Sequence, residues 1–401
     1  MMRRHAILLL SVFAAALFPL AGCVAERHYE SARVLHDLVS GEGASPLKRA
    51  TPAPVRVTVS YTVDGRERRA DLYLPGTLDG CGTPAVRHPP NCPRAALIAV
   101  PGAVSRANRD PRFIAFVVTL ARAGFAVLAP EMPGFRALRV RPQDAREIAD
   151  AFRYSLSRQE LAPRGRTGLF AFSYAVGPTV LAALENDIRD DVRFIAALGG
   201  YHDLPNAMRF FTTGWYARDG AWHHLKPDET GRMVLAYSGL DYLGNAADAT
   251  LFDQMVELRL KDAAADLAPL AGRLSEAGRA LYALAVNTDP ARFPRLLEGL
   301  PEAMRADLGY LDLARHDLSA LRARLFLVHG KNDNLIPWTE SLALAAAAPA
   351  GAARVFLIRR VLGHVDFAVS DLLSWRFWTE DLPDLWRLWR VVGLLLAERR
   401  P

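Results

Sequence analysis

The sequence predicts an α/β protein with a mostly parallel central sheet, an antiparallel hairpin before it and a large helical insertion within it. Three observations support this prediction. Residues 55–61 alternate between apolar and polar, short unbroken apolar runs begin at residue 95, and residues 204–320 contain helix-like segments without a buried-strand run. Unbroken apolar runs are typical of parallel strands that are buried on both faces of a sheet.

The composition is that of a globular protein with a substantial core. Hydrophobic residues make up 51% of the 401 residues and charged residues 23%, a balance that excludes a disordered chain. The formal net charge is +6, and no basic stripe interleaved with aromatic residues is present. The sequence therefore predicts no nucleic-acid partner.

The amino terminus has the features of an export signal. Arg3 and Arg4 precede an apolar run over residues 6–20, which is short for a membrane span. The run ends in Leu-Ala-Gly before Cys23, and this pattern resembles the lipobox of bacterial lipoproteins. The resemblance implies removal of residues 1–22, a thioether-linked diacylglycerol on Cys23 and acylation of the new amine, with an ordinary signal peptide as the alternative.

Two acyl chains or more anchor a protein stably to a bilayer. The residue after Cys23 is Val24 rather than aspartate. Under the usual sorting rule for lipoproteins this favours the outer membrane, facing the periplasm, if the cell is Gram-negative. We therefore expect an exported protein that is attached to a membrane by its lipid.

The segment between the signal and the sheet predicts a tether followed by a hairpin. Residues 23–54 are polar and rich in proline at their end, so we expect a tether with one short helix at residues 30–38. Residues 55–61 and 69–74 alternate around Asp64-Gly65, which is the turn signal of a β-hairpin.

Apart from Cys23, the chain has two cysteines. Cys81 and Cys92 lie in a stretch rich in glycine and proline and could pair as a disulfide in an oxidising compartment; two free thiols are the alternative. Neither has histidine neighbours at metal-ligand spacing, and the adjacent His223 and His224 point to different faces of any helix or strand. We predict no metal site.

From residue 95 the chain alternates between buried-looking strands and amphipathic helices. Among the helices, residues 144–156 and 174–184 have clear apolar faces, and the tryptophan-rich residues 375–389 predict a final helix, packed on the sheet or lying in a membrane interface. The predicted strands cover residues 95–100, 126–129, 167–171, 193–198, 325–328 and 354–358.

A candidate nucleophile follows the third of these strands. Ser173 stands directly between the strand at 167–171 and a helix, with Ala171 and Ala175 two residues to either side. A nucleophile on a sharp strand-to-helix turn requires small neighbours, and the turn exposes its hydroxyl at a helix amino terminus. The alternative for Ser173 is a simple helix cap.

A candidate acid and a candidate base follow the last two strands. Asp333 lies just past the strand at 325–328, and His364 follows the strand at 354–358. Open α/β sheets place their sites at the carboxyl ends of strands, so Ser173, Asp333 and His364 can meet there as a triad. Asp203, which follows the strand at 193–198, is the alternative acid.

From about Val55 to its end, the chain resembles the α/β-hydrolase superfamily. The resemblance rests on Ala-Phe-Ser173-Tyr-Ala at the elbow, on His-Gly-Lys-Asn-Asp333 at the acid and on Gly-His364 at the base. It implies Ser173 as nucleophile, His364 as general base and then acid, and Asp333 as the group that orients the imidazole. It further implies an oxyanion hole made by the backbone N–H groups of Tyr174 and Ala103.

Two positions depart from the pattern of this superfamily. Alanine occupies positions 171 and 175, where glycine is usual, and Pro101-Gly102 stands where His-Gly is commoner in the oxyanion loop. The first change costs little strain. The second changes the loop that supplies the second oxyanion donor.

The sequence thus predicts a membrane-anchored serine hydrolase that cleaves an ester, or another acyl bond, of a small-molecule substrate without a cofactor. Residues 55–203 and 321–401 would form the core, and residues 204–320 a lid that shapes the acyl pocket. Two alternatives remain: an acyltransferase using the same triad, and a non-catalytic, lipid-tethered binding or scaffold protein of the same fold.

Overall fold

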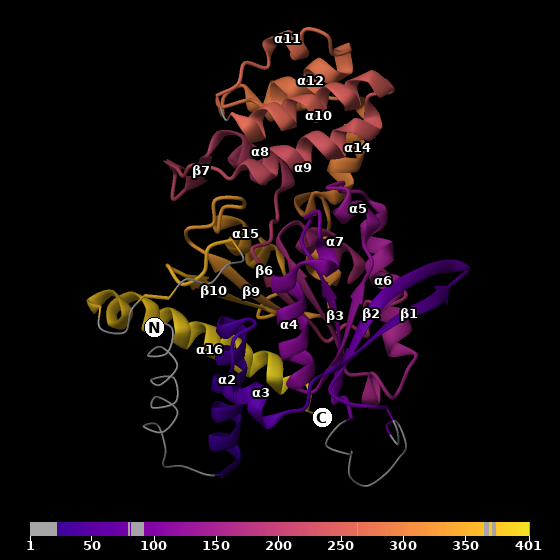
Figure 1. Cartoon of the computed structure of the whole chain (residues 1–401), viewed down its shortest axis with the longest axis vertical. Coiled ribbons are helices and arrows are strands. Elements are labelled where there is room, and N and C mark those ends of the chain that lie inside the picture. Colours follow the sequence, from indigo (N-terminus) through magenta and orange to yellow (C-terminus); the bar gives the residue numbers. More distant parts are fainter. Residues whose placement is uncertain are drawn as a thin grey trace.

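A computed structural model describes residues 22–78, 81, 92–262, 264–364, 369–370 and 374–400, and its centre is an eight-stranded sheet (Figure 1). The strand order is β1-β2-β4-β3-β5-β6-β9-β10. β2 pairs antiparallel with β1 and β4, and the remaining pairs are parallel. The predicted fold class is confirmed. The strands are β1 (Val55–Val63), β2 (Arg66–Leu74), β3 (Ala95–Val100), β4 (Phe125–Pro130), β5 (Thr167–Phe172), β6 (Phe194–Leu198), β9 (Arg324–Gly330) and β10 (Ala353–Ile358).

The hairpin forms because its two-residue turn suits the twist of the strands. Asp64 and Gly65 have φ values of 49° and 77°, the left-handed geometry that aspartate and glycine tolerate best at such a turn. Val63 pairs with Arg66 across it. The structure therefore has the hairpin at the expected turn.

Alternate residues of the parallel strands belong to two separate cores, one on each face of the sheet. Ile98 and Leu169 pack with helices α6 (Gln143–Leu156) and α7 (Val176–Ala182). Their neighbours Leu97 and Phe170 pack instead with the helices of the opposite face. This burial of both faces explains why the strands read as unbroken apolar runs. The helices of the second face are α4 (Pro111–Arg122), α16 (Leu382–Ala397) and α2 (Gly22–Ser40).

The segment predicted as a tether is instead an integral part of the second face. α2 is 19 residues long and packs against α16 and α4, with Val34 and Leu35 buried. Its buried Asp37 accepts a hydrogen bond of 2.7 Å from Thr119 of α4. The prediction of a single short helix at residues 30–38 was wrong, because α2 has partners that are distant in the sequence. A short helix, α3 (Pro46–Ala50), leads on to β1.

The predicted insertion forms a cap above the carboxyl-terminal edge of the sheet, at the top of Figure 1. Besides its helices, the cap contains a two-stranded hairpin, β7 (Trp215–Arg218) and β8 (Ala221–His224), which the sequence analysis did not predict. Tyr201 donates a hydrogen bond of 3.0 Å to the Leu311 carbonyl, which ties the end of the cap to the core. The cap helices are α8 (Leu204–Thr213), α9 (Glu229–Gly239), α10 (Ala246–Lys261), α11 (Ala268–Ala271), α12 (Glu276–Ala285), α13 (Phe293–Glu298) and α14 (Glu302–Leu311).

The structure joins Cys81 and Cys92 in a disulfide with a Cα–Cα separation of 5.6 Å. Most of the predicted export signal, residues 1–21, lies outside the described residues. Cys23 is in the first turn of α2. Among the helices of the described residues, none has both the length and the apolar character that crossing a bilayer requires.

Candidate active site

Ser173 occupies a strained turn between β5 and the helical segment that leads into α7. Its φ of 55° lies in the left-handed region, which costs a non-glycine residue about 1–3 kcal/mol and is typical of functional positions. Ala171 and Ala175 on either side are fully buried, so larger side chains would find no room there. The turn directs the Ser173 side chain into a cavity, as expected for a nucleophile elbow.

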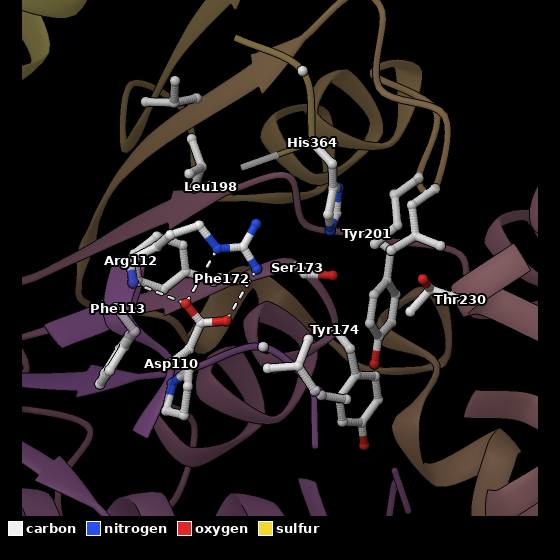
Figure 2. A pocket seen from close by; sticks show the side chains of 18 of the residues that line it. Asp110, Arg112, Phe113, Phe172, Ser173, Tyr174, Leu198, Tyr201, Thr230 and His364 are labelled. Carbon is white, nitrogen blue, oxygen red and sulfur yellow. Dashed lines mark hydrogen bonds and ion pairs between the residues drawn. The ribbon is translucent and has the colours of Figure 1, made fainter. Parts of the chain in front are cut away.

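The His364 ring points toward the Ser173 hydroxyl, as Figure 2 shows. On its other side, the ring Nδ1 lies 2.7 Å from the Oδ2 atom of Asp333. Because a carboxylate only accepts hydrogen bonds, Nδ1 carries the proton. In a neutral ring, Nε2 is then left as the proton acceptor. The structure therefore brings the predicted serine, histidine and aspartate together in the order that nucleophilic catalysis requires.

Asp333 is held in place by hydrogen bonds to both of its oxygens. Its Oδ1 atom accepts hydrogen bonds from the backbone N–H groups of Leu335 at 2.8 Å and Ile336 at 3.0 Å. Burial alone would raise the pKa of the Asp333 carboxyl. The charge of His364 and the hydrogen bonds from His329 and His364 outweigh that effect and hold the pKa well below its usual range. Asp333 is therefore ionised at neutral pH.

A second histidine, His329, supports the same carboxylate. Its Nε2 atom lies 3.3 Å from Asp333 Oδ2 and 3.0 Å from the Ile336 carbonyl oxygen, both of which are acceptors, so Nε2 carries a proton. Its Nδ1 atom lies 2.7 Å from the Ser341 hydroxyl. The structure makes it a positioning residue for Asp333.

Two glycines allow the three chain segments to approach one another. A Cβ atom at Gly199, after β6, would lie 3.2 Å from Asp333 Oδ2 and 3.3 Å from His364 Nδ1, and its φ of 66° disfavours other residues. A Cβ atom at Gly330, at the end of β9, would lie 2.4 Å from the Gly363 carbonyl oxygen. Gly330 thus lets the loop that carries His364 cross the end of β9.

The alternative acid, Asp203, has a different task. It is the N-cap of α8 and accepts a hydrogen bond of 2.7 Å from the Asn206 backbone N–H. Its own N–H donates to Glu340 at 2.8 Å. These contacts place Asp203 at the start of the cap, whereas Asp333 contacts the imidazole.

The loop after β3 lies beside the nucleophile, where the oxyanion hole was expected. A Cβ atom at Gly102 would lie 3.5 Å from the Ser173 Cβ, so the backbone of this loop approaches the serine closely. Ala103 and Tyr174 line the same cavity as Ser173. Their backbone N–H groups are the candidates for stabilising an oxyanion.

The cavity has a volume of about 740 Å³ and is lined mainly by apolar side chains, which is within the usual range of ligand pockets. Figure 2 shows Phe113, Phe172 and Leu198 on one side of Ser173, and Tyr201 and Thr230 on the other. Among the described residues, no group of three or more His, Cys, Asp or Glu side chains is placed to hold a metal ion.

No family model matches this sequence, and no curated protein matches it either. Solved structures that are similar to it include an acylaminoacyl peptidase from Pyrococcus horikoshii, at 11% identity over 87% of this chain and 42% of that chain, with a TM-score of 0.44. A puromycin-hydrolyzing peptidase from Mycobacterium tuberculosis aligns at 13% identity over 86% of this chain and 38% of its own, with a TM-score of 0.46.

A hyperthermophilic esterase from Pyrobaculum calidifontis aligns at 12% identity over 98% of this chain and 96% of its own, with a TM-score of 0.42. The chain thus spans less than half the length of the two peptidases. Similarity this low says nothing about activity. The sheet order, the strained serine between β5 and α7, and the Ser, Asp, His order at the ends of β5, β9 and β10 give this protein the α/β-hydrolase fold.

Proposed function

We propose that this protein is a serine hydrolase that cleaves ester bonds through an acyl-enzyme on Ser173. The observation that carries the proposal is the contact chain in which Asp333 binds His364 Nδ1 at 2.7 Å and the ring faces a serine with left-handed backbone geometry. A serine that only caps a helix requires no left-handed backbone geometry, and no imidazole needs to face its hydroxyl.

In the proposed reaction, Ser173 Oγ attacks the acyl carbonyl carbon while His364 Nε2 takes the hydroxyl proton. Asp333 stabilises the imidazolium that forms, and the backbone N–H groups of Tyr174 and Ala103 stabilise the oxyanion. His364 then gives the proton to the leaving alcohol. Water repeats the sequence on the acyl-enzyme, which releases the acid and restores Ser173.

A fluorophosphonate probe tests this proposal directly, because it phosphonylates only an activated serine. We expect the folded wild-type protein to be labelled, peptide mapping to place the label on Ser173, and heat denaturation before labelling to abolish it. The same preparation should hydrolyse nitrophenyl esters. A folded protein that takes no label and cleaves no ester would favour the non-catalytic binding protein instead.

We further propose that the enzyme is exported and attached to a membrane by a lipid on Cys23, with the outer membrane as its location in a Gram-negative cell. The proposal is supported by the basic start, the apolar run and the Leu-Ala-Gly-Cys sequence. The Cys23→Ala variant should therefore leave the membrane pellet, because an alanine cannot take the thioether-linked lipid.

The measurement is fractionation of cells followed by a high-salt wash of the membranes. Val24→Ala is the matched control, since it changes the adjacent residue and keeps the thiol, and it should remain in the pellet. If Cys23→Ala remained there to the same extent as the control, the lipid anchor would be refuted.

A further inference from the structure

On the second face, α4 and α16 pack over opposite parts of the sheet. α4 contacts β2 and β4, and α16 contacts β10 at the far edge. β5, β6 and β9 lie between these positions in the sheet. α2 contacts both α4 and α16, so it lies over the space between them (Figure 1).

This space forms part of the cavity that contains Ser173. α2 contributes Val34, Leu35 and Leu38 to its wall, and α16 contributes Leu388, Val392 and Leu395. All six side chains are aliphatic. We call this part of the cavity, bounded by β5, α4, α16 and α2, the acyl arm.

An aromatic wall connects the acyl arm to the nucleophile. Phe172 immediately precedes Ser173, and its ring centroid lies 4.9 Å from that of Phe116 on α4. The Phe116 centroid in turn lies 4.5 Å from that of Phe170, which is on the same face of β5 as Phe172. An apolar group that starts at Ser173 therefore meets aromatic carbon first and the aliphatic side chains of α2 and α16 beyond it.

The cap side of the cavity has a different character. It combines apolar side chains with two polar ones: Thr230 contributes a hydroxyl and Asn334 an amide, among apolar residues such as Met208, Phe211 and Leu308. The polar pair of the acyl arm, Asp110 and Arg112, form an ion pair of 3.0 Å at the start of α4. The Arg112 side chain is 60% exposed, so this pair marks the outer rim of the arm and leaves its interior apolar.

We infer that the substrates are esters of long-chain fatty acids, with the acyl chain in the acyl arm and the alcohol part under the cap. This inference rests on the proposed hydrolase activity. A chain of methylene groups gains from burial in a wholly apolar channel, while an alcohol needs the polar partners that the cap side offers. The cavity of about 740 Å³, which includes the acyl arm and the cap side, lies within the range of pockets that enclose whole organic ligands.

The first test is a series of nitrophenyl esters with acyl chains from acetyl to palmitoyl, assayed with the wild-type protein in detergent. If the chain lies in an apolar channel, kcat/KM should rise by up to about fourfold for each added methylene until the arm is filled. A protein that cleaves acetyl esters with no gain for longer chains would overturn the inference and leave the hydrolase proposal intact. A protein that takes no fluorophosphonate and cleaves no ester of any length would instead end both.

The second test places the same bulky side chain at three positions. Leu38→Trp fills the acyl arm from α2, Leu308→Trp fills the cap side from α14, and Leu342→Trp changes an exposed residue of α15 (Thr339–Ala347). We expect Leu38→Trp to lower the ratio of kcat/KM for palmitoyl esters to kcat/KM for acetyl esters by at least tenfold. Leu342→Trp, outside the cavity, should leave this ratio and fluorophosphonate labelling at the wild-type level.

The acetyl ester and the probe report whether each variant is folded and active. If Leu308→Trp rather than Leu38→Trp selectively lost the long esters, the chain would lie under the cap and the assignment would be wrong. If Leu38→Trp also lost the acetyl ester and the probe label, Val34→Phe, a smaller change in the same wall, should still give the selective loss. Equal effects of Val34→Phe on short and long esters would refute the acyl arm.

Discussion

Replacing Ser173 with alanine should lower kcat for any ester substrate by about 10⁵- to 10⁶-fold, as for other enzymes that lose a serine nucleophile. The reason is that the acyl-enzyme needs the oxygen that alanine lacks. Binding of the substrate should be nearly unchanged, because the cavity walls remain. The measurement is single-turnover hydrolysis of one nitrophenyl ester by wild type and variant.

The matched control for this substitution is Ser319→Ala, which removes a hydroxyl from an exposed serine at the end of the cap insertion. It should retain wild-type kcat and fluorophosphonate labelling. Label that persisted in Ser173→Ala, or a loss of kcat that was equal in the two variants, would remove Ser173 from the role of nucleophile.

The Asp333→Asn variant should lower kcat by about 10⁴-fold. An asparagine cannot stabilise the imidazolium, and its amide can donate to the ring and favour the wrong tautomer of His364. Asp203→Asn is the matched control, because asparagine caps a helix as well as aspartate does. We expect the control to lose less than tenfold in kcat, and the opposite ranking would transfer the acid role to Asp203.

The Asp333→Asn variant should also differ from wild type in how its stability depends on pH. The pKa of Asp333 is depressed in the folded protein, so its ionised form stabilises the fold at every pH above the ordinary aspartate value of about 3.9. That stabilisation is lost as the pH falls through the depressed pKa. The difference in unfolding free energy between wild type and Asp333→Asn should therefore be largest near neutral pH and shrink in acid.

The sheet was predictable because its strands are buried on both faces and therefore appear as unbroken apolar runs. The same runs placed the site, since Ser173, Asp333 and His364 each follow a strand that the sequence already marked. Their chain order then favoured a triad over three unrelated residues. What the order could not supply was the separation of the side chains, which depends on the close approach at Gly199 and Gly330.

The role of His329 was not predictable from the sequence alone. It lies within β9, four residues before Asp333, and the tight turn between them returns the Asp333 side chain to the end of the strand. The missing information was the partner of the second ring nitrogen, Ser341, which comes from α15. The two acceptors at Nε2 come from the loop after β9, and the hydroxyl at Nδ1 comes from α15. The positioning role of His329 is therefore evident only in the folded structure.

The hairpin of the cap had a local signal that was overlooked. Asp219 and Gly220 form its turn with φ values of 52° and 76°, and Asp-Gly between short alternating segments is the same signal that identified the first hairpin. β7 and β8 are only four residues each and mostly exposed. Their weak apolar content concealed them among helices.

The covering of the sheet by α2 has a practical consequence for anyone who prepares a shortened, lipid-free form of the protein. Removal of all residues before Val55 would expose the apolar side chains of α4 and α16 that pack with Val34. It would also remove Glu30, the partner of Arg399 in an ion pair of 2.7 Å. A truncation that starts at Glu26 retains both contacts. The two forms should differ in aggregation and thermal stability even though each contains every triad residue.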